Sequence, residues 1–214
     1  MKIELKNIHH SPQLSEETHA FTANLYINGT HAGYAKNDGR GGANHYHAKD
    51  EKGKLLIRNA EKFCAELPAK HNDNTLTKEV SWDMNLEQHI DDLLNNYLQK
   101  KELARFNNKL NEAILKGLVF GIPDHSFQGF VYPIPIRQIL AQPQGPATIL
   151  GDLITKVLPL LTDDNKLLNT NIPESILKAA GLKEELYVKP TIRNIRYGTI
   201  PYMEEDKNQT GRSR

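Results

Sequence analysis

The segment FTANLYINGTHAGYAK, residues 21–36, constrains the fold more than any other part of the chain. Two runs of alternating apolar and polar residues flank Asn28-Gly29, a pair that favours a two-residue type I′ turn because both residues tolerate positive φ. The pattern predicts an antiparallel hairpin in which Leu25 lies opposite Ala32. One face of this hairpin is then apolar and is expected to be the core side, with Phe21, Ala23, Leu25, Ile27, Ala32 and Tyr34.

The hairpin is expected to belong to an α+β fold. Residues 2–8 alternate as a third strand would, and the apolar positions of 52–67 fall on one side of a helix that can cover the sheet. Residues 85–115 lack glycine and proline and repeat leucine at helical spacing, which predicts one long helix with a slip of the apolar stripe near 99–102. The sequence therefore predicts a small antiparallel N-terminal sheet, a hairpin plus one strand, covered by a helix and followed by a long helix and a mixed, mainly helical C-terminal part.

Four stretches are expected along the chain. Residues 1–67 form an N-terminal α+β unit with a glycine-rich loop, and the polar residues 68–84 are expected to link it to the next part. Residues 85–202 form the helical or mixed C-terminal part. The charged residues 203–214 are expected to be a disordered tail.

Composition excludes several classes of protein. Hydrophobic residues make up 38% of the 214 residues, so a core can form, and 27 lysines and arginines against 26 acidic residues leave a net charge of +1. A strong global attraction to polyanions is thereby excluded, and contacts to nucleic acid must be local. The single cysteine, Cys64, and the absence of a long apolar run predict a cytoplasmic protein with no membrane partner.

The run NDGRGG follows the predicted hairpin, where the chain leaves the sheet. Glycines at such a place can turn successive backbone N–H groups inward to hold an anion, and an arginine adds charge. A plain turn is the alternative, because the run matches neither a P-loop nor a dinucleotide fingerprint. The candidate ligand-binding residues are Asn37, Asp38, Gly39, Arg40, Gly41, Gly42 and the neighbouring Tyr46.

Two imidazoles in HYH indicate a second kind of site. His45 and His47 point to the same side of any strand and can share a metal ion, with Asp38, Asp50 or His31 as further ligands. A metal-dependent hydrolase needs such a set. The alternative is a pair of surface histidines, since no H-E-x-x-H spacing supplies a third ligand.

Several aromatic residues are candidate stacking platforms for bases. Tyr26 lies on the more polar face of the hairpin, and Tyr46 follows the glycine-rich run. Stacking platforms combine such rings with a positive groove, which the sequence does not reveal. Phe127 and Phe130 are expected in a core, and Cys64 on an apolar helix face is expected to be inert.

The motif F-T-A-N-L-Y-I-N-G…N-D-G-R-G-G, within residues 21–42, resembles that of a family of bacteriophage and mobile-element proteins without assigned activity. The later L-L-N-T-N-I-P, residues 167–173, is similar to a second motif of that group. The resemblance implies a genetic setting and little chemistry.

These observations predict a binding protein without catalysis. It is expected to be a phage or mobile-element accessory factor that engages a nucleotide, a nucleic-acid phosphate or a host protein, with modulation of host defence as one role. A metal-dependent hydrolase and a purely structural interaction protein are the alternatives. The sequence indicates no particular cofactor and no oligomeric state.

Overall fold

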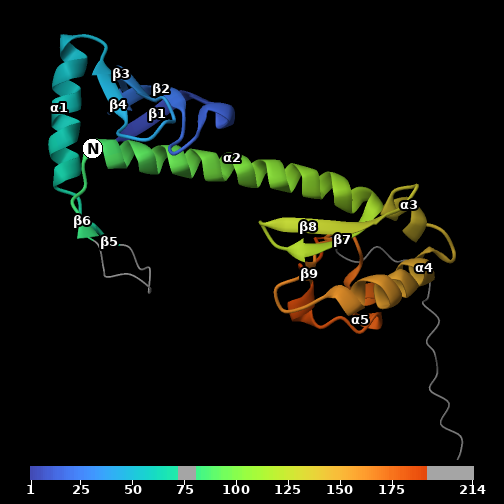
Figure 1. The fold of residues 1–214 in the computed structure, drawn as a ribbon. Coiled ribbons are helices and arrows are strands. Elements are labelled where there is room, and N and C mark those ends of the chain that lie inside the picture. Colours follow the sequence, from blue (N-terminus) through green and yellow to red (C-terminus); the bar gives the residue numbers. More distant parts are fainter. Residues whose placement is uncertain (72–80, 192–214) are drawn as a thin grey trace, which may run out of the picture. The chain divides into compact units, whose positions relative to one another are not determined.

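The computed structural model of the chain describes residues 1–71 and 81–191. Its contacts divide the chain into two compact units, unit 1 (Met1–Lys101) and unit 2 (Glu102–Arg214). The boundary falls inside helix α2, Leu86–Lys116, which Figure 1 shows as one continuous helix. Each unit is described by itself below.

Unit 1 is built on a four-stranded antiparallel sheet in which each strand pairs with its neighbour in the sequence (Figure 1). The predicted antiparallel N-terminal sheet is confirmed, and it has one strand more than the hairpin and the single strand that were expected. The strands are β1 (Ile3–His10), β2 (Phe21–Ile27), β3 (Thr30–Asn37) and β4 (His45–Ala48).

The turn between β2 and β3 is the predicted one. Asn28 has φ 49° and Gly29 has φ 79°, and Ile27 pairs with Thr30 across a two-residue connection. These values fit a type I′ turn, whose twist matches that of the two strands.

The register beyond the turn differs from the prediction by one residue. Leu25 pairs with Gly33 rather than with Ala32, because a β-bulge interrupts the ladder next to the turn. The bulge moves Tyr34, which was predicted to face the core, to the opposite face, where it is 49% exposed. Ala35 takes the buried place instead and is fully covered.

A close approach of backbones explains this bulge. A Cβ on Gly33 would lie 2.0 Å from the carbonyl oxygen of His47, so only glycine fits there beside β4. The neighbouring carbonyl of Ala32 accepts a hydrogen bond of 2.9 Å from the N–H of Lys49. A Cβ on Gly53 would likewise meet that carbonyl oxygen at 2.1 Å. The first turn of the following helix therefore packs directly on the bulge.

Helix α1 (Glu51–Ala65) covers the inner face of the sheet, as predicted for residues 52–67. The Asp50 side chain caps it by accepting a hydrogen bond of 2.7 Å from the N–H of Gly53. The core of unit 1 unites the inner face with α1 and the first part of α2; its buried members are Ile3, Phe21, Ala23, Leu25, Ile27, Ala32, Ala35, Ile57, Ala60, Cys64, Leu86, Ile90 and Leu94.

The predicted boundary at residues 68–84 and the observed division at Lys101 are different places along the chain. The reason is that Leu86, Ile90 and Leu94 of α2 are needed to complete the core of unit 1. Short strands β5 (Lys70–His71) and β6 (Ser81–Trp82) pair at the two ends of the predicted linker. Its middle lies outside the described residues.

Helix α2 agrees with the long helix predicted for about 85–115. Ile114, near its end, is buried with Val119 and Leu168 in unit 2. Residues 99–105, which include the slip of the apolar stripe predicted near 99–102, are all exposed. The slip of the apolar stripe thus falls in a part of α2 that contributes no buried residue to the core of either unit.

Unit 2 contains a three-stranded sheet of order β8-β7-β9. Strands β7 and β8 form its hairpin, and residues 145–160 divide into an α-helix, a π-helical turn and a 3-10 turn. The elements are β7 (Gly117–Ile122), β8 (Ser126–Val131), α3 (Ile136–Leu140), α4 (Gly145–Asp152), β9 (Lys166–Leu167) and α5 (Glu174–Ala179).

The L-L-N-T-N-I-P segment supports the fold of unit 2. Asn169 is fully buried, accepts a hydrogen bond of 2.7 Å from the N–H of Val119 and donates one of 2.8 Å to the carbonyl of Gly117. It therefore replaces strand pairing at the start of β7 on the edge away from β8, where backbone groups would otherwise be buried without partners.

Part of the C-terminal prediction lies beyond the described residues. An isolated bridge joins Tyr187 to Leu167, and the predicted tail at 203–214 lies outside the described residues. Among the described helices, none combines the length and the apolar character that a membrane span requires.

Candidate functional site

The glycine loop, residues 37–44, connects β3 to β4 and contains most of the predicted ligand-binding residues. Gly39, Gly41 and Gly42 have φ values of 86°, 88° and 88°, a region that other residues enter only with strain. The three glycines of the run are thus required by the path of the chain.

Asn37 organises this loop from the inside. Its side-chain oxygen accepts hydrogen bonds from the N–H of Gly39 at 2.8 Å and from the hydroxyl of Thr18 at 2.9 Å. Its amide nitrogen donates to the carbonyl of Gly42 at 3.2 Å and to the side chain of Asn44 at 3.1 Å. Asn37 is 7% exposed, so it holds the loop and offers little surface to a ligand.

A second asparagine joins the loop to helix α2. The N–H of Asn44 donates to the Glu87 carboxylate at 3.1 Å, and the side-chain amide of Asn44 donates to the Asp91 carboxylate at 2.7 Å. Asn44 is itself buried. Two carboxylates of α2 therefore lie against the loop on the side that faces this helix.

The loop also packs on the segment before β2. The carbonyl of Gly39 accepts from the N–H groups of Glu16, Glu17 and Thr18 at 2.8, 3.0 and 3.3 Å, and the N–H of Gly41 donates to the Thr18 hydroxyl at 3.3 Å. A Cβ on Gly39 would lie 2.1 Å from the carbonyl oxygen of Leu14. The amides of Gly39 and Gly41 are thus already used inside the protein, which favours a structural role for these glycines over an open anion-binding concavity.

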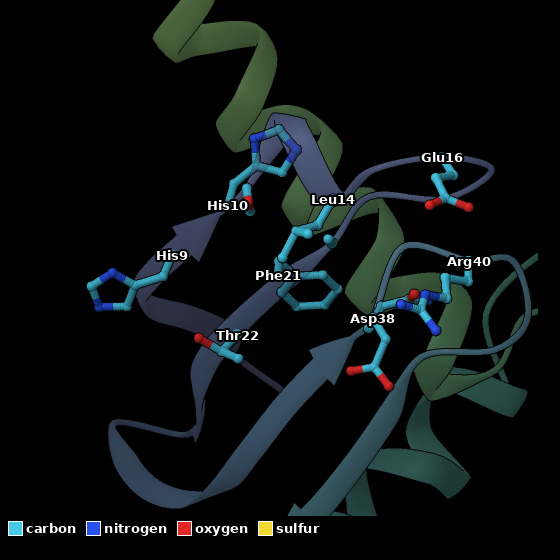
Figure 2. Close-up of a pocket in the computed structure, with 11 residues that line it drawn as sticks. His9, His10, Leu14, Glu16, Phe21, Thr22, Asp38 and Arg40 are labelled. Atoms are coloured by element: carbon cyan, nitrogen blue, oxygen red, sulfur yellow. The ribbon is translucent and has the colours of Figure 1, made fainter.

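A hollow of about 580 Å³ opens beside the glycine loop (Figure 2). Figure 2 shows Asp38 and Arg40 on the loop after β3, with His9 and Thr22 coming from β1 and β2. Carboxylates balance the charge of Arg40 in this hollow, since Asp38 and Glu16 also line it. An anion would meet both signs of charge there.

The remaining predicted residues lie on β4. The hydroxyl of Tyr46 donates to the Glu61 carboxylate of α1 at 2.9 Å, and burial together with this carboxylate raises the pKa of Tyr46 to about 12. Tyr46 thus faces the core side and not the loop. His45 and His47 are exposed on the opposite face, opposite Lys36 and Tyr34.

A metal site at His45 and His47 would need a third ligand. Among the described residues, no group of three histidine, cysteine, aspartate or glutamate side chains is placed to hold a metal ion. The thiol of Cys64 is buried, and burial raises its pKa, which disfavours the reactive thiolate.

The face of the sheet on the side away from α1 carries a different set of side chains. The strand register places them in three rows across β1 to β4, and all are exposed or half-buried. We call this set the outer face: Glu4, Tyr26 and His31; Lys6, Asn24, Tyr34 and His47; His9, Thr22, Lys36 and His45.

Four of these residues form a continuous chain of contacts. The ammonium of Lys6 lies 4.4 Å from the ring centroid of Tyr26, a cation–π distance. Tyr26 and His31 stack with centroids 5.1 Å apart, and His31 meets Tyr34 edge-on at 5.2 Å. These contacts orient the Tyr34 ring while half of its surface stays exposed.

A second hollow, of about 450 Å³, lies on the outer face next to Tyr34. Its size falls within the range of about 300–1,000 Å³ that is usual for small-molecule sites. Polar side chains surround it on all four strands: Asn7, His9, Thr22, Asn24, Lys36 and His47.

The charge of the outer face is positive. Lys6 and Lys36 are opposed by one carboxylate, Glu4, which forms an ion pair of 2.9 Å with Lys2. The hydrogen bond from Lys2 lowers the pKa of Glu4, so that this carboxylate is charged but compensated. Lys6 and Lys36 against Glu4 leave a charge of +1 on the outer face itself, and Lys2, which pairs with Glu4, brings the local charge to +2.

Comparison with known proteins adds no assignment. Neither a protein-family model, nor a curated protein, nor a solved structure matches the chain.

The sequence alone does not indicate Tyr34, Lys6 and Lys36 as a group. The three residues come from β1 and β3, and nothing in the linear sequence joins them into a basic stripe. The alternation of β1 was a usable signal for Lys6. Tyr34 and Lys36 required the bulge beside Gly33, since the expected register turns both of them inward.

Proposed function

We propose that unit 1 is a non-enzymatic nucleic-acid-binding module and that the outer face of its sheet is the contact surface. The observation that carries the proposal is the local excess of lysines and imidazoles on a sheet face whose side chains are exposed or half-buried in the described part of the chain. Protein contacts to nucleic acid consist largely of hydrogen bonds and ion pairs to phosphates, which such a surface can make.

An anion contact was predicted for the glycine loop. The proposal places this contact on the neighbouring strands instead. The loop amides of Gly39 and Gly41 have partners within the protein, whereas Lys6 and Lys36 project from an exposed face. Arg40 lies at the margin of this surface, because the hollow that it lines also includes His9 and Thr22.

The resemblance of residues 21–42 to bacteriophage and mobile-element proteins supports a nucleic-acid ligand, since such elements depend on the copying and transfer of nucleic acid. A phage or mobile-element accessory factor that binds nucleic acid in the host cell is the setting we propose.

The test is fluorescence anisotropy with a labelled DNA strand of about twelve nucleotides and a duplex of the same length. The parent protein is expected to bind at about 50 mM salt and to lose affinity steeply towards about 200 mM, because phosphate contacts release counterions. Lys36→Glu is expected to weaken binding about 10-fold and to lower the slope of log affinity against log salt by about 1.

Lys52→Glu is the matched control, since it makes the same charge change at an exposed position of α1. It is expected to alter the affinity less than about twofold. Absence of binding to both probes at low salt, or an equal effect of the two variants, would show the proposal to be wrong.

A further inference from the structure

We propose that the outer face binds single strands in preference to duplexes, with one unpaired base stacked on Tyr34 in the adjoining hollow. This inference rests on the proposed function and concerns the form of the nucleic acid and the residue that recognises it. It assigns Tyr34 a role that its position along the sequence does not suggest.

The first support is the presentation of the Tyr34 ring. Tyr34 is 49% exposed on the third of four strands, and its neighbours across the strands are Asn24 and His47. A half-exposed aromatic ring on a sheet is the device by which several single-strand-binding proteins stack a base. Duplex bases are already stacked on one another and cannot use it.

The second support is that the ring is held in place before any ligand arrives. His31 meets Tyr34 edge-on, stacks on Tyr26 and donates a hydrogen bond of 3.1 Å from Nε2 to the carbonyl of Gly33. At the other end of this series of contacts, the Lys6 ammonium lies over the Tyr26 ring. A fixed ring loses little freedom on binding, which strengthens an interaction of this kind.

The third support is the chemistry around the ring. The hollow next to Tyr34 is lined by hydrogen-bonding side chains that suit a base edge, among them Asn24 and Thr22. Lys36 lies on the same strand two residues from Tyr34 and projects to the same face. A phosphate beside the stacked base therefore has a cation within the same patch.

The experiment compares three labelled probes with the full chain: a strand of about twelve thymidines, a strand of equal length made of abasic sites, and a duplex of equal length. The thymidine strand is expected to bind at least about 10-fold more tightly than the other two, because only it offers unpaired bases. Equal affinities for the three probes would overturn the stacking inference while leaving the proposed function in place. Failure of all three to bind would overturn both.

Variants locate the base. Tyr34→Ala is expected to weaken binding of the thymidine strand about 10-fold and to leave the abasic strand within about twofold, whereas Tyr34→Phe keeps the ring and the affinity. Tyr97→Ala is the matched control, because Tyr97 is an exposed tyrosine of unit 1 that lies on α2. An unchanged affinity of Tyr34→Ala for the thymidine strand would overturn the inference.

A measurement on the parent protein removes any dependence on how Tyr34→Ala folds. A thymidine strand that carries one 5-iodouracil is irradiated in the complex, and the cross-linked peptide is identified by mass spectrometry. The adduct is expected on Tyr34. Adducts confined to peptides outside β1 to β4 would overturn the inference.

Discussion

The glycine loop and the outer face are neighbours in unit 1, and His9 and Thr22 line the hollows of both. They differ in how their polar groups are used. In the loop, the side chain of Asn37 and the amides of Gly39 and Gly41 are hydrogen-bonded within the loop itself or to Thr18. On the outer face, lysine, histidine and tyrosine side chains project from strands whose backbone is already paired.

This difference separates residues that shape the protein from residues that can act on a ligand. Glycine and asparagine clusters attract attention because both functional loops and tight turns need them. Here the buried asparagine and the positive φ angles show that the turn requires them. The comparison predicts that loop substitutions change stability, and that outer-face substitutions change binding.

The largest expected effect is that of Gly39→Ala, which combines a φ of 86° with a Cβ placed 2.1 Å from the backbone oxygen of Leu14. We expect it to lower the free energy of unfolding by about 3 kcal/mol or more. Hydrogen exchange of β2 and β3 peptides at increasing urea concentrations measures the stability of unit 1.

Gly42→Ala is the matched control for this experiment. Its φ is 88°, but no atom lies within 4 Å of the added Cβ, so only the backbone strain of about 1 kcal/mol is expected. Equal losses in the two variants would show that packing on the Leu14 carbonyl contributes nothing.

An intermediate effect is expected for Asn37→Ala. The change removes the acceptor of the Gly39 N–H and the Thr18 hydroxyl, and it leaves buried groups without partners. We expect the free energy of unfolding to fall by about 2–3 kcal/mol. Thr22→Ala, on the outer face, is expected to change it by less than about 0.5 kcal/mol in the same hydrogen-exchange measurement. Similar values for both variants would remove the distinction between the two regions.

The smallest effect is expected for Arg40→Ala. Arg40 is exposed, and Asp38 and Glu16 line the same hollow, so its charge is locally compensated. We expect less than about a threefold loss of affinity for the thymidine strand, against about 10-fold for Lys36→Glu. Anisotropy titrations at equal salt measure both. A larger loss of affinity in Arg40→Ala than in Lys36→Glu would indicate that the binding site is at the glycine loop and not on the outer face.

Much of unit 1 could be predicted because its signals are local. Asn28-Gly29 determines a turn, and the spacing of apolar residues determines the two helices. The bulge could not be predicted with the same rules, because the contact that requires Gly33 comes from the backbone of His47. An isolated glycine in a strand pattern was the available signal.

Unit 2 was harder to predict for a related reason. β7 is an almost continuous apolar run, whose buried residues show no alternation, and β8 contains a glycine. Its polar support comes from Asn169, about fifty residues later, which no local pattern connects to Gly117.

The candidate site shows the same limit. His45 and His47 were correctly expected to share one face, since this follows from the two-residue period of a strand. The neighbours that make this face a surface of interest lie on other strands. Register, rather than composition, brings Lys6, Asn24 and Tyr34 into one row.

The strand order of unit 1 has a consequence for how the chain folds. Each strand pairs with the one before it, so the sheet forms from contacts between residues close in sequence, which favours rapid folding. The core is complete only when Leu86, Ile90 and Leu94 of α2 are available. During synthesis the sheet can therefore assemble early, but it gains its full stability only after the first three turns of α2 have left the ribosome.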